Sequence, residues 1–379
     1  MSEPLSLGAI VRAKGPELVA NETLSPRQLQ VLRRIADCRT AALGGHRDRC
    51  DRCQHEHVFW NSCRDRHCPA CGGEARRLWL EKRCKEVLDV PYFHVVFTIP
   101  DRLEPLVLHA PELLYAILLR CAGQALVDVA GTKLKATIGA LAVLHTWGQT
   151  LAFHPHIHCV VPGGGFSLED GRWVHVPTGT FLLHRTPLSR RFRTLFKNAI
   201  SEAFERGELT LPPSMDQRRA ALDLLLAQSS KTDWHTYVKP PFGGPEHVLA
   251  YLAAYTHRIA ISNHRLLAFD GESVTFRFRD YNDGNAQKPM TLPATEFLSR
   301  FMTHVVPEGF VRVRYYGFLA NRDRTANIER ARELIGERRA RTQNDPAPNA
   351  RLCPECKAGT MQTVARLDPM QPRTWFDSS

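Results

Sequence analysis

The stretch that most constrains the fold spans residues 144–165 and reads LHTWGQTLAFHPHIHCVVPGGG, with an HPHIH centre before an apolar triplet and a glycine run. Side chains alternate between the two faces of an extended strand, so His156 and His158 are predicted to share one face, with Ile157 buried behind them. Two imidazoles placed in this way predict a two-point metal site, to which Gln149 would add a neutral third ligand. The alternative is a pair of surface histidines on an edge strand.

Composition sets the class of protein. The chain has 379 residues, 43% of them hydrophobic, enough for a sizeable core and for two or three domains. The 50 Lys and Arg residues outnumber 39 Asp and Glu, and the net charge of +11 favours a polyanionic partner. The sequence contains no run of 18 apolar residues and no signal-peptide pattern, so we expect a cytoplasmic protein with no membrane partner. In that reducing compartment, clustered cysteines are predicted to be metal ligands rather than disulfides.

Cysteines crowd the polar segment that follows a predicted helix at residues 25–43. The pairs Cys50/Cys53 and Cys68/Cys71 predict one structural zinc site, because zinc would supply folding free energy that this core-poor stretch lacks. A second zinc site of the Cys₂His₂ type would use the remaining candidates: Cys38, His46, Cys63 and His67. The alternative is a small apolar role for the cysteine and a surface position for the histidines. The later pair Cys353/Cys356 offers only half a site.

Basic residues mark candidate contacts with DNA. Arg64 and Arg66 lie between the cysteine pairs, close to aromatic residues, a combination that suits a DNA-contacting zinc-held loop. A solvated basic face would have the same composition. Arg258, Arg277 and Arg279 lie on predicted strands and are candidates for a groove that follows a phosphate backbone.

Hydrophobic periodicity predicts an α+β fold. The expected strands are 92–99, 138–147, 156–161, 258–269, 274–279 and 310–318. The expected helices are 103–130, 189–206, 215–229, 293–305 and 324–341.

A further helix is predicted after a rigid connector at residues 237–245, and it carries Tyr251 and Tyr255. Their spacing of four residues places both hydroxyls on one helix face. A tyrosine is a poor nucleophile at neutral pH because its pKa is about 10, and a neighbouring metal or basic group would lower that pKa. The alternative is an ordinary half-buried stripe, with Val248 and Leu252 on the core side.

Together these segments resemble the HUH-type two-tyrosine rolling-circle transposases of the insertion sequence ninety-one family and their common-region relatives. The resemblance covers nearly the whole chain and rests on CDRC…SCRDRHCPAC, FHVVFTIP, HTWGQTLAFHPHIHCVVPGGG, KPPFGGPEHVLAYLAAYTHRIAISNHRL and GFVRVRYYGFLANR. It implies an antiparallel-sheet HUH endonuclease core with helices on one face, preceded by a small zinc-binding domain. The implied domains are a helix plus zinc-binding domain (1–88), a nuclease and strand-transfer domain (89–335), and a basic linker and tail with a CxxC pair (336–379).

The resemblance also implies an enzyme that nicks and rejoins single-stranded transposon ends, at the bacterial nucleoid when bound to DNA. His156, His158 and Gln149 would hold Mg²⁺ or Mn²⁺, while Tyr251 and Tyr255 would form 5′-phosphotyrosine links during cleavage and strand transfer. The sequence has no GxxxxGK[ST] loop, so no nucleotide cofactor is expected, and host replication or helicase functions would separate the strands. Two alternatives are a plasmid replication initiator or relaxase of the same chemistry and a non-catalytic zinc-finger DNA-binding protein.

Overall fold

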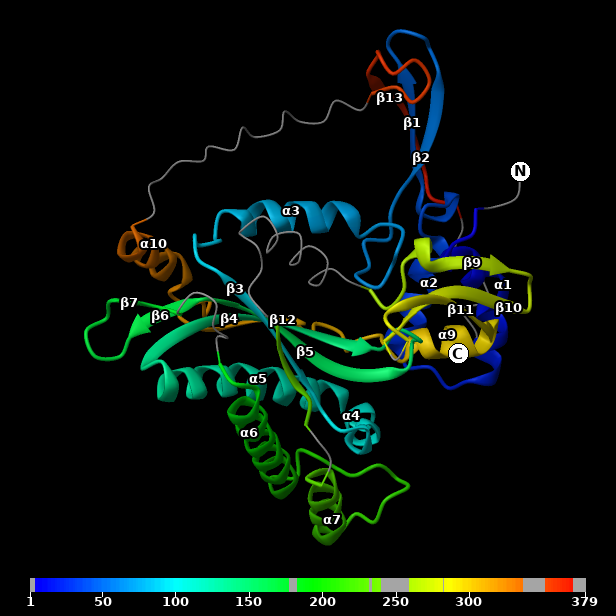
Figure 1. The fold of residues 1–379 in the computed structure, drawn as a ribbon. Helices are drawn as coiled ribbons and strands as arrows, with labels where there is room; N and C mark the ends of the chain where they lie inside the picture. Colours follow the sequence, from blue (N-terminus) through cyan, green and yellow to red (C-terminus); the bar gives the residue numbers. More distant parts are fainter. Residues whose placement is uncertain are drawn as a thin grey trace.

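The computed structural model describes residues 4–176, 183–231, 234–239, 259–281, 283–336 and 352–370, and its fold is α+β, as predicted (Figure 1). Within these residues the largest sheet has seven strands in the order β7-β6-β4-β5-β3-β8, and β12 pairs with the free side of β4. Its strands are β3 (Tyr92–Thr98), β4 (Ala136–Trp147), β5 (Phe153–Pro162), β6 (Gly164–Ser167), β7 (Trp173–His175), β8 (Thr236–Lys239) and β12 (Val313–Gly317). The neighbouring strands run antiparallel.

One face of this sheet is covered by the long helix α5 (Pro111–Lys133), which packs on Ile157 and Cys159 of β5. The predicted helix 103–130 is in fact two helices, because Pro111 cannot donate the backbone hydrogen bond that would continue α4 (Glu104–His109). Below α5 in Figure 1 lie α6 (Arg185–Glu205) and α7 (Arg219–Ser229).

The same helix α5 is the one described helix that is long and apolar enough to cross a membrane, by length and composition alone. However, 67% of its most apolar 18-residue window is buried inside the protein. Burial of this kind is typical of the core helix of a globular domain.

The opposite face of the sheet also receives helices. Ile328 and Ala331 of α10 (Arg324–Ile335) belong to a core cluster with Leu141 and Val143 of β4. Trp79 of α3 (Gly73–Cys84) packs against the same cluster. Helices therefore lie on both faces of the sheet, not only on the α5 face.

The glycines after β5 interrupt the strand without ending it. The break falls at Gly163, and the chain continues as β6 on the same side of β4. A Cβ on Gly164 would lie 2.6 Å from the ring of Trp173, so a larger residue does not fit there. The glycine run is thus a site of close packing.

A second hydrophobic core joins the N-terminal helices to residues 260–302, across the predicted boundary at residue 88. Val31, Leu32 and Ile35 share this core with Phe297 and Phe301. Its elements are α1 (Leu7–Asn21), α2 (Pro26–Asp37), β9 (Leu266–Phe269), β10 (Ser273–Asp280), β11 (Ala286–Pro293) and α9 (Ala294–Met302). Ser25 caps α2 through a capping box with Gln28, and the helix ends at Asp37, earlier than the predicted residue 43.

Two local predictions are wrong in part. The described portion of the predicted strand 258–269 is regular only in β9, after a short 3₁₀ turn at Asn263–Arg265. The start of the predicted connector is the edge strand β8, whose Val238 pairs with Val95 of β3, while the rest of the connector lies outside the described residues. Between β9 and β10 the chain turns at Asp270 and Gly271, where Gly271 has a φ of +100°.

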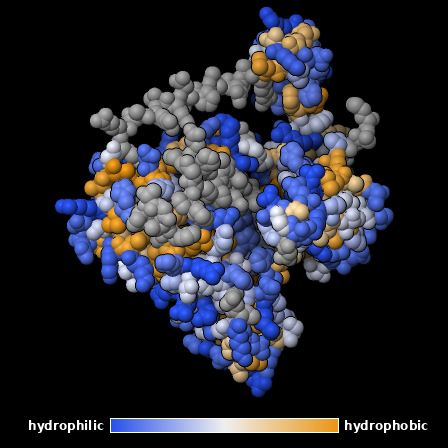
Figure 2. Space-filling view, viewed as in Figure 1, coloured by the Kyte–Doolittle hydropathy of each residue, from blue (hydrophilic) through white to orange (hydrophobic). Residues whose placement is uncertain are grey.

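A third sheet projects from the body of the molecule (Figure 1). It consists of β1 (Gly45–Cys50), β2 (Glu56–Trp60) and β13 (Met361–Leu367), in the order β13-β1-β2. Figure 2 shows this sheet as a projection that carries both hydrophilic and hydrophobic residues, above a face on which hydrophilic residues predominate.

Candidate metal centres

Three histidines come together on the central strand β5 and its neighbour β4. His145 is paired with His156, and Val143 with His158, so the three imidazoles project from the sheet face opposite Ile157. One ligand nitrogen of each ring lies within 4.8 Å of the others. The predicted orientation of His156 and His158 on one face is therefore confirmed, and the imidazole of His145 lies on the same face.

Hydrogen bonds orient two of these rings. His156 Nδ1 donates to the backbone carbonyl of His154 at 2.7 Å, which leaves the lone pair on its Nε2. His158 Nδ1 lies 2.8 Å from Nε2 of His94 on β3. Burial, helped by Lys239 and His156, lowers the pKa of His94 to about 3, so a neutral His94 can accept the proton of His158. Outer partners of this kind fix the tautomers that metal ligands need.

The buried His145 was missed by the sequence reasoning. Its ring stacks on Trp147 at 4.7 Å and contacts the ring of His158 at 4.5 Å. The sequence alone carries no reliable signal, because the register of β4 and β5 shifts between His145 and Trp147. Counting outward from the pair of Trp147 and Phe153 would place His145 opposite Pro155 instead of His156.

In the structure, the predicted third ligand Gln149 contacts residues other than the three histidines. Its side-chain amide donates to the hydroxyl of Tyr281 at 3.1 Å, and its backbone carbonyl accepts from Arg265. The loop position of Gln149, beyond the end of β4, accounts for this difference. The candidate nucleophiles Tyr251 and Tyr255, and Arg258, lie outside the described residues.

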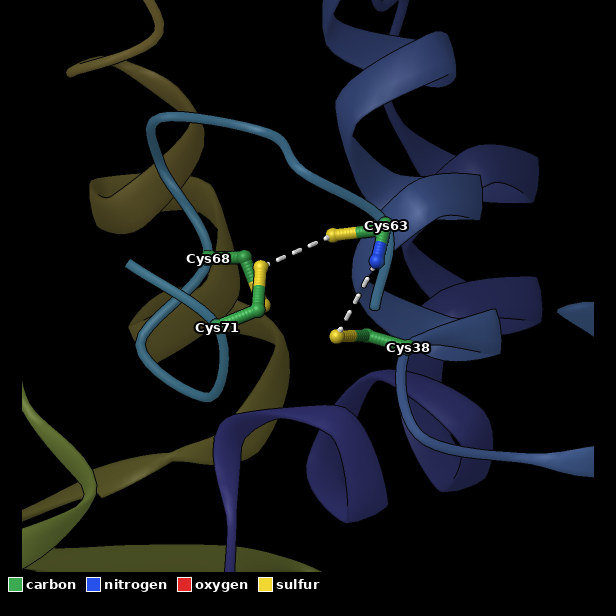
Figure 3. A group of neighbouring side chains, drawn as sticks. All are labelled: Cys38, Cys63, Cys68 and Cys71. Carbon is green, nitrogen blue, oxygen red and sulfur yellow. Dashed lines mark hydrogen bonds between the residues drawn. The ribbon is translucent and has the colours of Figure 1, made fainter. Parts of the chain in front are cut away.

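Four cysteines from three parts of the N-terminal segment form a second group: Cys38, Cys63, Cys68 and Cys71. Figure 3 shows their side chains converging, and the sulfurs of Cys63 and Cys71 are 3.6 Å apart. Zinc–sulfur bonds of about 2.3 Å place the sulfurs of a tetrahedral site about 3.8 Å apart. The group therefore has the dimensions of a Cys₄ zinc site.

The backbone beside these cysteines is strained. Arg39 follows Cys38 with a φ of 61°, and Arg64 follows Cys63 with a φ of 53°. The left-handed conformation costs roughly 1–2 kcal/mol for a residue with a Cβ. Such positions persist where surrounding contacts impose them, and a metal held by the preceding cysteine is a contact of this kind.

This arrangement corrects the predicted zinc ligand sets. Cys68 and Cys71 are grouped with Cys38 and Cys63, whereas Cys50 and Cys53 lie beside Cys353 and Cys356. The two predicted histidine ligands are engaged elsewhere: His46 stacks on Phe59, and His67 uses both of its ring nitrogens in hydrogen bonds.

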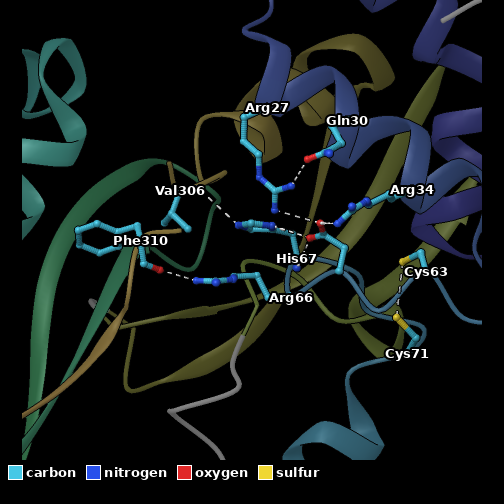
Figure 4. A network of polar contacts seen from close by, with 10 residues as sticks. Arg27, Gln30, Arg34, Cys63, Arg66, His67, Cys71, Val306 and Phe310 are labelled. Carbon is cyan, nitrogen blue, oxygen red and sulfur yellow. Dashed lines mark hydrogen bonds and ion pairs between the residues drawn. The ribbon is translucent and has the colours of Figure 1, made fainter. Parts of the chain in front are cut away.

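The loop that carries these cysteines is held by the buried carboxylate of Asp65. Its partners Arg27, Arg34 and His67 point toward one another in Figure 4. Asp65 accepts from His67 Nδ1 at 2.8 Å and pairs with Arg27 and Arg34 of α2. His67 Nε2 accepts from the backbone N–H of Val306 at 3.3 Å. Although burial alone would raise the pKa of Asp65, the hydrogen bonds from His67 and the charge of Arg27 hold it well below its usual range.

The candidate DNA-binding arginines differ in their surroundings. Arg66 donates to the carbonyl of Phe310 at 2.6 Å, so part of its role is structural. Arg64 is exposed, and Arg277 and Arg279 share the exposed face of β10. These three remain available for contacts with a phosphate backbone.

Comparison with known proteins identifies the class. Two family models match, one described as "Transposase zinc-binding domain" over residues 10–99 and one as "Putative transposase" over residues 139–326. "Putative transposase y4qJ" of Sinorhizobium fredii (strain NBRC 101917 / NGR234) is 44% identical over 389 residues, 97% of this chain and 98% of that protein. "Transposase for insertion sequence element IS801" of Pseudomonas savastanoi pv. phaseolicola is 30% identical over 301 residues, 78% of this chain and 71% of that protein. No solved structure matches the chain.

A zinc-binding domain followed by a transposase domain defines a DNA-processing protein that holds structural Zn²⁺. The chain belongs to the insertion sequence ninety-one family of transposases.

Proposed function

We propose that this transposase cuts and rejoins single-stranded DNA at transposon ends by attack of a tyrosine on the scissile phosphate. The observation that carries the proposal is the group of three imidazoles on β4 and β5, backed by the rigid core of α5. Neutral nitrogen ligands leave a divalent cation its full charge. When bound there, Mg²⁺ or Mn²⁺ would polarise the phosphate and stabilise the charge that develops during attack.

His145 replaces Gln149 as the third ligand in this proposal. Its ring is buried, stacked on Trp147 and in contact with His158, so little conformational freedom remains to be lost on metal binding. Gln149 would first have to give up its bond to Tyr281.

Tyr251 and Tyr255 are the proposed nucleophiles. A phenolate oxygen forms a bond to phosphorus, the bond from phosphorus to the 3′ oxygen breaks, and the 3′ oxygen leaves as a hydroxyl after taking up a proton. The 5′-phosphotyrosine ester conserves the energy of the broken bond. Attack on that ester by another 3′-hydroxyl rejoins the strand, and the second tyrosine serves the second cleavage. Host replication or helicase functions supply the single strands.

The Cys₄ group of Figure 3 is the proposed structural zinc site of the N-terminal domain. Zinc there orders the loop that carries Arg64, and we propose that Arg64, Arg277 and Arg279 contact the DNA backbone. The proposal rests on their exposed positions and on the basic charge of the chain.

Single-stranded oligonucleotides labelled at one end, incubated with Mn²⁺ or Mg²⁺, test the nucleophiles. The wild-type protein should give a protein–DNA adduct that survives denaturation. Tyr251→Phe and Tyr255→Phe should each impair strand exchange, and the double variant should form no adduct. An adduct from the double variant would disprove the assignment, and intact DNA with the wild-type protein would favour a non-catalytic binder.

A matched pair of variants tests the third metal ligand. His145→Ala should weaken Mn²⁺ binding, measured by the loss of free-ion signal in electron paramagnetic resonance, and should reduce adduct formation. Gln149→Ala should leave both close to wild type. The reverse order of effects would return Gln149 to the ligand set. His156→Ala serves as the reference for loss of a ligand already predicted.

A further inference from the structure

Two segments far apart in the sequence, β1 with β2 and β13, meet in the projecting sheet, and four cysteines meet there with them. Cys50 and Cys53 come from the end of β1, whereas Cys353 and Cys356 immediately precede β13. The last two lie beyond both family matches, which end at residues 99 and 326. We propose that these four thiolates bind a second Zn²⁺ ion, which joins the N-terminal and C-terminal segments into one zinc ribbon.

The sulfur geometry fits a tetrahedral ion. All four sulfurs lie within 4.8 Å of one another, with Cys50 and Cys356 3.7 Å apart and Cys53 and Cys353 3.6 Å apart. A Zn(Cys)₄ site requires separations of about 3.8 Å. Disulfide sulfurs are about 2.05 Å apart, so the arrangement is that of a metal site and not of two cross-links.

The two cysteine pairs have matching backbones, although they lie about 300 residues apart. The residue after each second cysteine is left-handed, with a φ of 64° at Gln54 and 53° at Lys357. Backbone N–H groups point at the sulfurs in both halves, from Cys53 to Cys50 at 3.5 Å and from Gly359 to Cys356 at 3.3 Å. N–H groups aimed at sulfur stabilise thiolates, the form that binds zinc.

Among the described residues, the projecting sheet has only a small hydrophobic core. Its buried cluster contains Cys50, Cys353 and Met361, with Cys356 packed against them. Three strands need a hydrophobic face or a covering helix to be stable, and a metal can take that role. The site is also packed closely, since a Cβ on Gly359 would lie 2.4 Å from the sulfur of Cys50.

Further polar contacts hold the same two segments in register. β1 and β13 pair antiparallel from Gly45 with Leu367 to Cys50 with Met361. The hydroxyl of Thr363 donates to the buried Asp48 at 2.8 Å. The strands therefore set the register of this pairing, and the proposed ion would stabilise it. Loss of the ion would release β13 from β1.

Metal counting on the full-length protein tests the site. The double variant Cys353→Ser/Cys356→Ser should contain one zinc fewer per chain than the wild type, by mass spectrometry of the metal after removal of loosely held ions. Cys84→Ser is the control, because Cys84 is a half-buried cysteine outside both groups. An unchanged zinc content in the double variant overturns the proposal.

Thiol reactivity in the wild-type protein tests the site without any substitution. Cys53 is exposed and Cys84 is not, so exposure alone predicts faster alkylation of Cys53. Bound zinc predicts the opposite order, with Cys53 and Cys356 protected until a zinc chelator is added. Cys53 that reacts faster than Cys84 before chelation, or cysteines found as disulfides in the peptide map, overturns the proposal.

Discussion

The buried carboxylate of Asp65 provides the sharpest test of the packing between the cysteine loop and helix α2. The residue is 3% exposed and accepts hydrogen bonds from the backbone and ring of His67, at 2.9 and 2.8 Å. It also pairs with Arg27 at 3.0 Å and with Arg34 at 3.3 Å. Asp65→Asn keeps the shape of the side chain and removes its charge.

The size of the effect follows from burial. The Asp65 side chain is 1% exposed and that of Arg27 is 18% exposed, so the lost charge cannot be replaced by water. Removing one partner of a buried ion pair costs about 3–5 kcal/mol, whereas an exposed pair contributes about 0–1 kcal/mol. Asp65→Asn should therefore lower the free energy of unfolding by about 3–5 kcal/mol. Asp216→Asn, at an exposed Asp–Arg pair that water screens, should change the free energy of unfolding far less.

Urea unfolding at pH 7, followed by circular dichroism at saturating zinc, measures the difference. Zinc content measured in parallel shows whether the loop has also lost its metal. If the Asp65 variant unfolds within about 1 kcal/mol of the Asp216 variant, the network does not carry the stability that its burial indicates.

Two further predictions concern packing and pH. Gly123→Ala should destabilise α5 by about 1–3 kcal/mol, because a Cβ would lie 2.4 Å from the ring of Tyr316. Gly131→Ala in the same helix, where the nearest atom is 3.9 Å away on Leu168, should stabilise it by up to about 1 kcal/mol; equal shifts in thermal unfolding would contradict this packing. Burial lowers the pKa of His304 from 6.5 to about 4, so the folded protein favours the neutral ring. The free energy of unfolding therefore keeps the full contribution of His304 above pH 6.5, and it falls by about 1.4 kcal/mol per pH unit as the pH drops from 6.5 toward 4. His304→Gln should flatten that slope in urea titrations at several pH values, and an unchanged slope would exclude His304 as its source.

Strands β3, β4, β5 and β12 of the central sheet were predictable because each has a local signal, whereas the short strands β6, β7 and β8 were not predicted. β3 is a β-branched and aromatic run that ends before Pro100, and the two-residue period of β5 places His156 and His158 on one face. The position of His145 depends on the pairing of two strands, with an irregularity between His145 and Trp147. Register of this kind comes from tertiary packing and from the turn, so a single strand does not reveal it.

The cysteine grouping was not predictable from spacing, because every CxxC pair offers the same ligands. Cys38 reaches Cys63 because α2 ends there and the N–H of Arg39 donates to the carbonyl of Asn61 at 3.0 Å. Cys353 reaches Cys50 only through a strand pairing that spans most of the chain. The local sequence around these cysteines does not indicate that Cys38 lies near Cys63 or that Cys353 lies near Cys50.

Hydrogen bonds connect the loop of the first cysteine group (Cys38, Cys63, Cys68 and Cys71) to the strand that carries His145. Arg66, within the cysteine loop, donates a hydrogen bond to the carbonyl of Phe310. Two residues later, the backbone carbonyl of Arg312 accepts a hydrogen bond from the N–H of Leu144 at 3.0 Å. Leu144 precedes His145 on β4, and β12 continues along the same strand. Two hydrogen bonds thus connect the loop that carries Cys63, Cys68 and Cys71 to the strand that carries His145. The proposed zinc site and the proposed histidine metal site therefore share one continuous set of contacts, and β4 is also held by its pairing with β5 and β12.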